Sequence, residues 1–165
     1  MEFLDIVNTN DTVIGRASRE EVYKQKLTHR IAHVFVFNTQ GKLLLQLRSG
    51  NVDFFPHCWV TSVGGHVMSG ETPEQAAHRE TMEEIGVKLK LAPAYYELYD
   101  DPRGLKKFLY TFTAEHNGPF THDAHDVTEL RFVPLQKVWG MIRDGEPFHP
   151  ELLFLLNKHY KSADV

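Results

Sequence analysis

The sequence predicts a single α+β domain in which helices pack on a mixed β-sheet. The chain has 165 residues, about the size of one domain, and 42% of them are hydrophobic, which is enough for a sizeable core. Short segments rich in β-branched and aromatic residues are interspersed with segments that begin with helix-capping signals. No repeat or linker divides the chain. We therefore expect one domain over residues 1–165, with a short N-terminal β segment (1–28) packed on it.

The N-terminal segment is expected to form two short strands and a helix. Residues 3–7 are predicted as the first strand, and the turn-forming residues 8–11 follow it. Residues 13–16 are predicted to pair back as the second strand. Ser18 and Glu21 have the spacing of a capping box, so a short helix is expected to begin there.

A β-hairpin is predicted over residues 31–38 and 42–48. The first of these segments is rich in β-branched and aromatic residues, and a glycine-containing turn separates the two. Residues 59–63 are predicted as a further strand, which ends at Gly64 and Gly65.

The helix with the clearest signals begins after Thr72. Thr72 and Gln75 form a second capping box, and Pro73 occupies the first helical position. The helix runs for about a dozen residues, and Gly86 stands where a helix-ending glycine belongs. The remaining predicted elements are strands at 88–98, 105–115 and 127–133, and helices at 135–143 and 150–160.

Composition excludes several classes of protein. The formal net charge of −4 argues against a duplex nucleic-acid-binding domain, because phosphate binding needs a cationic surface. No segment has the length of apolar sequence that a membrane span needs, and the first thirty residues lack a signal-peptide pattern. The single cysteine, Cys58, cannot form an intramolecular disulfide. We therefore expect a protein of the cytoplasm, while its oligomeric state has no signature in the sequence.

Three glutamates of the predicted helix are the main candidates for chemistry. Glu80, Glu83 and Glu84 are spaced i, i+3 and i+4, so they share one helix face, where like charges repel. A hard divalent cation such as Mg²⁺, with Mn²⁺ as an alternative, would neutralise this face and bind substrate phosphates. Arg79 lies four residues before Glu83 and is expected to orient that carboxylate, so we include it in the catalytic set.

Small residues surround this acidic face. Ala76 and Ala77 lie one turn earlier and are expected to leave room for a ligand. Gly64 and Gly65 precede the helix and permit the backbone to approach a metal or a phosphate. A solvated acidic helix face would explain the glutamates alone, but not the glycines, the arginine and the helix start together.

The segment 64–87 resembles the signature of the Nudix hydrolases, G-x5-E-x7-R-E-U-x-E-E-x-G-U, in which U is a bulky aliphatic residue. The matching residues are Gly65, Glu71, Arg79, Glu80, Glu83, Glu84, Gly86 and Val87. Thr81 departs from the signature, since an aliphatic residue is usual there, and this puts the local helix packing in question. Gly65 and Gly86 have structural roles in this motif.

The resemblance implies an α/β/α sandwich and Mg²⁺-dependent hydrolysis of a nucleoside diphosphate linked to another group. It implies that Glu83 and Glu84 bind metal, and that Glu80 binds metal or acts as the base. The carbonyl of Gly64 would complete a metal site, and Glu71 would brace the loop or support the metal ligands from behind. The partner implied is a small-molecule diphosphate.

Segments outside the signature resemble the branch of the family near isopentenyl diphosphate isomerase: residues 4–8, 29–48 and 55–66. His29 and His66 match two of the metal-binding histidines of such isomerases. However, Gly64 replaces the cysteine that they carry, and the strand at 106–112 lacks their two glutamates. Cys58 cannot be assumed to substitute. We therefore expect a hydrolase on an isomerase-like scaffold, with an isomerase or a non-catalytic nucleotide-binding domain as alternatives.

Three residues outside the signature are further candidates. Asp126 or Glu129 would supply a late acidic residue that helps with metal or base, and the alignment favours Asp126. Arg48 has the planar donor geometry that suits a substrate phosphate, although an ordinary surface role explains it equally well. The loops at 51–57 and 100–105 are expected to recognise the rest of the substrate. Phe54, Phe55 and Trp59 are expected in the core, although one of them could stack on a base.

Overall fold

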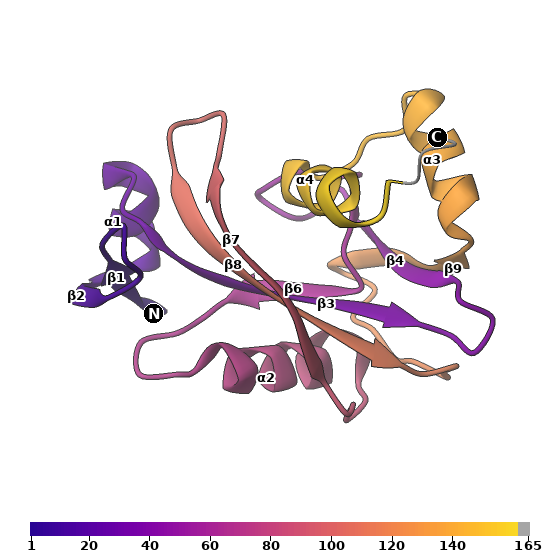
Figure 1. Cartoon of the computed structure of the whole chain (residues 1–165), viewed down its shortest axis with the longest axis horizontal. Helices are drawn as coiled ribbons and strands as arrows, with labels where there is room; N and C mark the ends of the chain where they lie inside the picture. The colour runs from indigo at the N-terminus through magenta and orange to yellow at the C-terminus, as the bar shows by residue number, and fades with distance from the viewer. Residues whose placement is uncertain (162–165) are drawn as a thin grey trace.

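The computed structural model describes residues 1–161, in which a mixed β-sheet lies between helices (Figure 1). The strands are β1 (Phe3–Val7), β2 (Val13–Ser18), β3 (His29–Phe37), β4 (Leu43–Arg48), β5 (Trp59–Val60), β6 (Val63–His66), β7 (Ala92–Asp100), β8 (Lys106–Glu115) and β9 (Val127–Val133). The helices are α1 (Arg19–Gln25), α2 (Pro73–Ile85), α3 (Leu135–Arg143) and α4 (Pro150–His159). Within residues 1–161, none of the helices is long and apolar enough to cross a membrane.

The main sheet has seven strands, and two of them diverge to create an opening. The strand order is β5-β4-β3-β8-β7, with β6 paired to β3 and β9 paired to β4. The β3–β8 pair is parallel, and the other pairs are antiparallel. Strands β3 and β4 pair only at Phe37 and Leu43, so they separate toward the start of β3, where β6 lies alongside.

Each face of the sheet buries its own hydrophobic core, which confirms the expected sandwich. Alternate residues of β3 point to opposite faces. Ala32 and Val34 pack in the core beneath α2, whereas Ile31 and Phe35 pack in the core beneath α3 and α4. Figure 1 shows α2 on one side of the sheet and α3 and α4 on the other.

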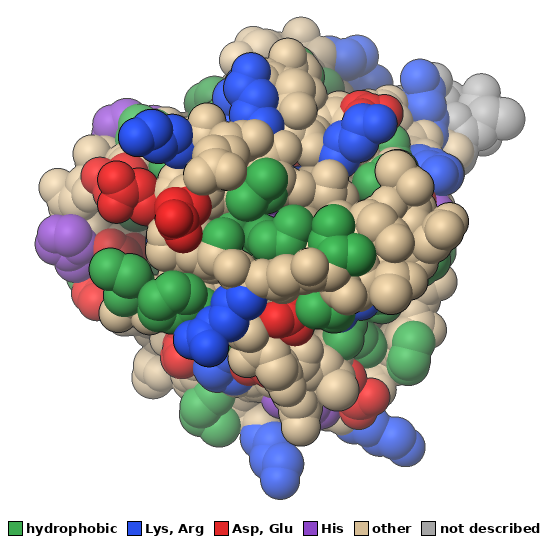
Figure 2. Space-filling model, turned by 90° about the vertical axis from the view of Figure 1, so that its left-hand side faces the viewer, with side chains coloured by type: hydrophobic (Ala, Val, Ile, Leu, Met, Phe, Trp, Pro, Cys, Tyr) green, Lys and Arg blue, Asp and Glu red, His purple; other side chains and the backbone are tan. Residues whose placement is uncertain are grey.

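The N-terminal strands form a separate two-stranded sheet that is attached to the main sheet by polar contacts. Asp11 accepts a hydrogen bond from Nε of Arg30 at 2.7 Å and others from the hydroxyls of Tyr96 and Tyr110. Oγ of Ser69 donates to Asp5 at 2.7 Å. Figure 2 shows the face of the molecule that lies at the left in Figure 1, where the N-terminal strands are. On this face, basic, acidic and hydrophobic side chains are mixed rather than gathered by charge.

The prediction of one strand over 59–63 is wrong, because the chain crosses here from β4 to β3. Strand β5 pairs with β4 and β6 pairs with β3, so Gly64 and Gly65 lie within a strand. Thr61 and Ser62 make the crossing, and their hydroxyls replace ladder hydrogen bonds. Oγ1 of Thr61 contacts the Val63 carbonyl at 3.0 Å, and Oγ of Ser62 donates to the Leu44 carbonyl. The strand predicted from residue 88 begins later, at Ala92.

Candidate active site

Helix α2 carries the acidic side chains, and local interactions fix both of its ends. The Thr72 side chain accepts a hydrogen bond from the backbone of Gln75, and the Gln75 side chain accepts one from the backbone of Thr72. The helix ends at Gly86, whose φ of 70° favours glycine. Ala76 and Ala77 are buried against the sheet, so our expectation that they leave room for a ligand is wrong.

Thr81, the residue that departs from the signature, packs without loss of a hydrogen bond. Its side chain is buried, and Oγ1 donates to the carbonyl of Ala77 at 2.6 Å. A hydroxyl with a partner in its own helix can be buried at little cost. Threonine is therefore compatible with helix packing at this position.

Arg79 links the acidic residues of the site. Its Nε and Nη2 donate to the two carboxylate oxygens of Glu71 at 2.7 and 3.0 Å. Its Nη1 donates to Glu80 at 2.8 Å and to Glu83 at 3.3 Å, and Nη2 also reaches the carbonyl of His66. The bond to Glu71, followed by that to Glu80, raises the pKa of Arg79 despite partial burial. The expected contact with Glu83 is thus the longest of these ion pairs.

Glu71 connects the helix to the loop that precedes it. Besides the two bonds from Arg79, it accepts a hydrogen bond from the backbone of Met68 at 2.9 Å. Partial burial raises the pKa of Glu71, but the Arg79 hydrogen bond and the Met68 amide outweigh this effect and lower it. Its contacts are those of a brace between the loop and α2.

Glu80 lies directly against the backbone of β6. A Cβ atom at Gly65 would overlap the carboxyl group of Glu80, so a glycine is required for this approach. Burial raises the pKa of Glu80, and the hydrogen bond from Arg79 works in the opposite direction. Glu80 is thereby held between Gly65 and Arg79.

Glu84 is the glutamate most strongly affected by burial. Nε2 of Gln46, in β4, donates to Glu84 at 3.0 Å and to the Ser62 carbonyl at 3.1 Å. Burial, followed by the charge of Glu80, raises the pKa of Glu84 well above its ordinary value. Two carboxyl groups therefore stand close together in a poorly solvated place, where a bound cation would stabilise their charged forms.

Glu83 is more exposed than Glu80 and is turned toward Arg79. Its side chain is 57% exposed, against 14% for Glu80. As the side chains stand in residues 1–161, no three acidic, histidine or cysteine groups converge on one point suitable for a metal ion. The donor set of Glu80, Glu83 and Glu84 nevertheless consists of oxygen atoms alone, which fits a hard divalent cation.

The three glutamates open into a cavity of about 680 Å³, a size typical of small-molecule sites. Gly64, Arg48 and Asp126 also line this cavity. Glu129 lies outside the lining and forms an ion pair with Arg131. Of the two candidate late acids, Asp126 is therefore the one that faces the same space as the glutamates.

Arg48 lines the cavity near Glu84 and Asp126. Its Nε is buried and has no hydrogen-bond partner among the described residues, and burial lowers the pKa of its guanidinium. Asp126 contacts Nδ1 of His125 at 2.8 Å and is well exposed. A guanidinium with a free donor beside an acidic site is a typical position for phosphate binding.

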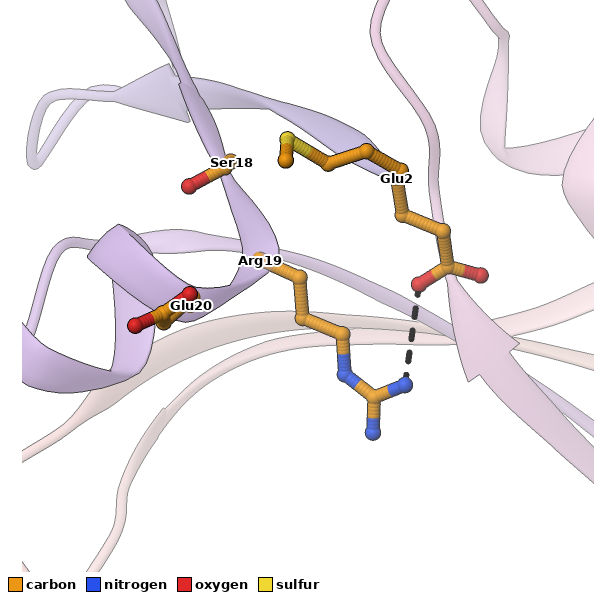
Figure 3. A pocket seen from close by; sticks show the side chains of 5 residues that line it. Glu2, Ser18, Arg19 and Glu20 are labelled. Atoms are coloured by element: carbon orange, nitrogen blue, oxygen red, sulfur yellow. Dashed lines mark ion pairs between the residues drawn. The ribbon is translucent and has the colours of Figure 1, made fainter.

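Both predicted recognition loops and the N-terminal helix contribute to the cavity wall. Phe54 stacks on Tyr23 of α1 with 5.4 Å between ring centroids, and it is 39% exposed rather than part of the core. Phe55 also lines the cavity, as does Arg103 of the β7–β8 loop. Arg19 of α1 also lines the cavity, and its Nη1 forms an ion pair with Oε2 of Glu2 at 3.7 Å (Figure 3). The expectation of core positions for Phe54 and Phe55 is therefore wrong.

A second group of polar side chains lines the cavity beneath α4, and the sequence analysis missed it. We call His33, Lys107, His149 and Glu151 the distal group. Glu151 accepts hydrogen bonds from Nζ of Lys107 and from Nε2 of His33, both at 3.0 Å. Glu151 is the only acidic residue of the apolar helix α4, and Gln46 is the only uncharged polar residue of β4. For both Glu151 and Gln46, the signal in the sequence was a single polar residue among apolar neighbours of a buried element.

The geometry around Gly64 disfavours an isomerase-type site. A Cβ atom at Gly64 would lie 3.1 Å from both Nδ1 of His33 and Oγ1 of Thr61. His29 is buried and His66 is half-buried, and desolvation lowers their pKa values to about 4 and about 3. Nε2 of His66 is hydrogen-bonded to the hydroxyl of Tyr23 at 2.7 Å. A cysteine side chain at position 64 would therefore require its neighbours to move.

Comparison with known proteins gives the family. The NUDIX domain model matches residues 27–156. The chain is 32% identical over 163 residues to the uncharacterized Nudix hydrolase all7351 of Nostoc, covering 97% of this chain and 96% of the relative. It is 30% identical over 146 residues to the uncharacterized Nudix hydrolase YfcD of Escherichia coli, covering 88% and 81%.

Solved structures agree with this result. DR0079 from Deinococcus radiodurans is 28% identical, with a TM-score of 0.85 over 97% of this chain and 100% of that protein. The Nudix domain of Shewanella oneidensis NrtR, solved in complex with ADP ribose, shares the fold at 18% identity, with a TM-score of 0.64 over 86% of this chain and 96% of that one.

These matches define a class of enzyme, a hydrolase that acts on pyrophosphate bonds. The chain belongs to the Nudix family. Members of this family generally use divalent metal ions.

Proposed function

We propose that the protein is a Mg²⁺-dependent pyrophosphohydrolase that cleaves the diphosphate of a nucleoside diphosphate linked to another group. The observation that carries this proposal is the crowding of Glu80 and Glu84 beside Gly64, at the wall of a cavity of about 680 Å³. In the proposal, Glu80, Glu83, Glu84 and the Gly64 carbonyl hold Mg²⁺, with Mn²⁺ as an alternative. When bound, the cation would neutralise phosphate oxygens and lower the pKa of the attacking water.

The side chains around the proposed cation have separate roles, one in proton transfer and the others in orientation. Glu80 is the proposed proton acceptor, because its carboxyl is held by Arg79 at the cavity wall, beside the proposed cation. Arg79 orients Glu80 and Glu83, Glu71 holds Arg79, and Gln46 orients Glu84. These residues keep the reacting carboxylates in place without touching the substrate.

Two further residues are proposed to contact the substrate or its ions. In the proposal, Arg48 donates to a phosphate oxygen, and Asp126 supplies a negative charge beside Arg48 on the same cavity wall. Replacing Asp126 with Asn should reduce turnover several-fold, whereas the same change at the neighbouring acid, Glu129→Gln, should leave it unaltered. Equal effects of the two changes would remove Asp126 from the site.

The isomerase alternative has less support. Gly64 offers no thiol, Lys107 occupies the strand where glutamates would be needed, and Cys58 has a pKa raised by burial. The likeness to the isomerase branch stays a hypothesis about scaffold ancestry. The cytoplasm is the proposed location, because a lone cysteine fits a reducing compartment.

The test is hydrolysis with a defined set of diphosphates. Purified protein is incubated with Mg²⁺, and then with Mn²⁺, and with nucleoside triphosphates, nucleotide sugars, dinucleotides, coenzyme A and isopentenyl diphosphate. Release of phosphate or monophosphate that disappears in Glu83→Gln and persists in Glu74→Gln, a change at an exposed acid of the same helix, supports the proposal. Binding without release would indicate a nucleotide-binding domain, and an allylic product would indicate an isomerase.

A further inference from the structure

The distal group is buried and charged, although its surroundings are apolar. Lys107 and Glu151 are each only 3% exposed, and His33 is 6% exposed. Leu109, two residues from Lys107 on the same face of β8, and Leu152 beside Glu151 both belong to the hydrophobic core beneath α4. A buried ion pair is weak evidence for stability, because apolar residues of similar size often serve equally well. Stability alone therefore does not explain the Lys107–Glu151 pair. Because both residues line the cavity, we consider contact with a ligand as the reason for the pair.

The same layer contains polar atoms that have no protein partner. His29 is opposite Lys107 in the β3–β8 register, and Thr111 is opposite His33. Within residues 1–161, Nε2 of His29 and Oγ1 of Thr111 are both buried without a hydrogen bond. Unsatisfied polar atoms are rare in folded proteins. Neither residue lines the cavity, so these atoms show only that the layer around the distal group is polar.

The distal group offers both donors and acceptors. Nδ1 of His149 accepts a hydrogen bond from the Glu151 backbone, and burial lowers the pKa of His149 to about 4. The neutral ring therefore carries its proton on Nε2, which is a donor. Lys107 has three ammonium hydrogens, of which Glu151 uses one.

Glu151 supplies the negative charge. Burial alone would raise its pKa, but the His33 hydrogen bond and the charge of Lys107 lower it well below its usual range. An ionised carboxylate would repel a second phosphate, and an apolar isoprenoid chain would leave the ion pair without polar contacts. Hydroxyl groups, which both donate and accept, match this set of atoms.

The distal group is adjacent to the proposed diphosphate site. Gly65 lies against Glu80, whereas the preceding residue of β6, Gly64, lies against His33. Both sets of side chains line the same cavity. A ligand with its diphosphate at the glutamates thus has its attached group within the space that the distal group borders.

We propose that Lys107, His149 and Glu151, supported by His33, bind hydroxyl groups of the moiety attached to the diphosphate, as in a ribose or another sugar. This inference rests on the proposed function, since it requires the diphosphate to sit at the glutamates. It makes the distal group a determinant of specificity that selects hydroxylated diphosphates over isoprenoid ones.

The test measures binding without turnover, by calorimetry in Mg²⁺. The probes are methylene-bridged ADP-ribose, methylene-bridged dimethylallyl diphosphate and bare methylenediphosphonate. The variant is Lys107→Met/Glu151→Met, since removing both charges avoids an unpaired buried ion and should preserve folding. The control is Lys106→Met, which changes the exposed neighbouring lysine of β8.

We expect wild-type protein to bind the ADP-ribose analogue at least tenfold more tightly than the dimethylallyl analogue. The double variant should lose this preference but bind methylenediphosphonate as before, with a melting temperature near that of the wild type. An unchanged preference in the double variant, or a wild-type preference for the dimethylallyl analogue, would overturn the inference. Should the double variant unfold, Lys107→Gln/Glu151→Gln, which also removes both charges but keeps polar side chains able to hydrogen-bond to each other, decides by the same criterion.

The experiment separates this inference from the proposed function. Failure of wild-type protein to bind methylenediphosphonate, or equal binding by Glu83→Gln, would count against the diphosphate site itself. Normal methylenediphosphonate binding combined with equal affinity for both organic probes would count against the distal group alone.

Discussion

The two sides of the cavity are assembled in different ways. On the α2 side, Glu71, Arg79, Glu80, Glu83 and Glu84 come from one continuous segment. On the α4 side, the distal group comes from β3, β8 and the start of α4, and His33 and Glu151 are 118 residues apart in sequence. A helix converts a short spacing into a shared face, so the first arrangement can be predicted from sequence. The second requires knowledge of how the strands pair.

The largest expected effect tests the α2 side. Glu80→Gln removes the proposed proton acceptor while keeping the side-chain shape, so kcat should fall by roughly 10²- to 10⁴-fold. Steady-state kinetics on the substrate found in the diphosphate screen would measure it, with Glu74→Gln as the matched control. Activity of Glu80→Gln within a few-fold of wild type would show that another residue acts as the base.

The next effect concerns stability on the same side. Arg79→Met leaves Glu71 and Glu80 without their ion-pair partner, and we expect a loss of about 3 kcal/mol in the free energy of unfolding. Urea denaturation in the absence of divalent metal measures this loss. Arg143→Met, at an exposed arginine in the last turn of α3, serves as the control and should change little. A similar loss in both variants would show that the Arg79 contacts add nothing specific.

The third prediction concerns the α4 side and the dependence of the free energy of unfolding on pH. His29 and His149 have pKa values lowered to about 4 by burial, against 6.5 in an unfolded chain. Between these values the unfolded state binds more protons, so stability falls as the pH drops. At pH 5 the loss is about 2 kcal/mol for each histidine.

Urea denaturation at pH 7 and pH 5 measures this loss. His149→Asn keeps a side-chain acceptor at the start of α4 but cannot titrate, so its stability should depend less on pH than that of the wild type. The same pH dependence in this variant would mean that His149 is not held neutral by burial.

The smallest expected effect concerns metal affinity. Gln46→Leu removes the donor that holds Glu84, and loss of such an orienting hydrogen bond typically weakens metal binding by about tenfold or more. Calorimetric titration with Mn²⁺ measures it, and Gln40→Leu, at an exposed turn position, provides the control. Unaltered affinity would show that the helix alone positions Glu84.

Much of the fold could be predicted, because capping residues and strand composition act locally. Both capping boxes and the ending of α2 at Gly86 are confirmed. The error at residues 59–63 arose because Thr61 and Ser62 have strand-compatible side chains, and only their bonds to neighbouring backbone reveal the crossing. Local propensity does not say which of two strands a segment will pair with.

For the candidate site, the sequence was informative where the spacing of residues along a helix determines which side chains share a face. The acidic face of α2 and the closeness of Arg79 to Glu83 followed from helical periodicity. The same periodicity failed for Ala76 and Ala77, because it does not say which side of the helix meets the sheet. Gln46 and Glu151 were missed since their partners lie far away in sequence.

The family match begins at residue 27, yet Arg19 and Tyr23 line the cavity. A chain cut at that boundary would retain every glutamate of α2 and lack one side of the space into which they open. The family match therefore includes the residues proposed for the reaction, but not the whole wall of the cavity. Because α1 borders the cavity, we expect that exchanging residues 1–26 between relatives would change which ligands the cavity accepts.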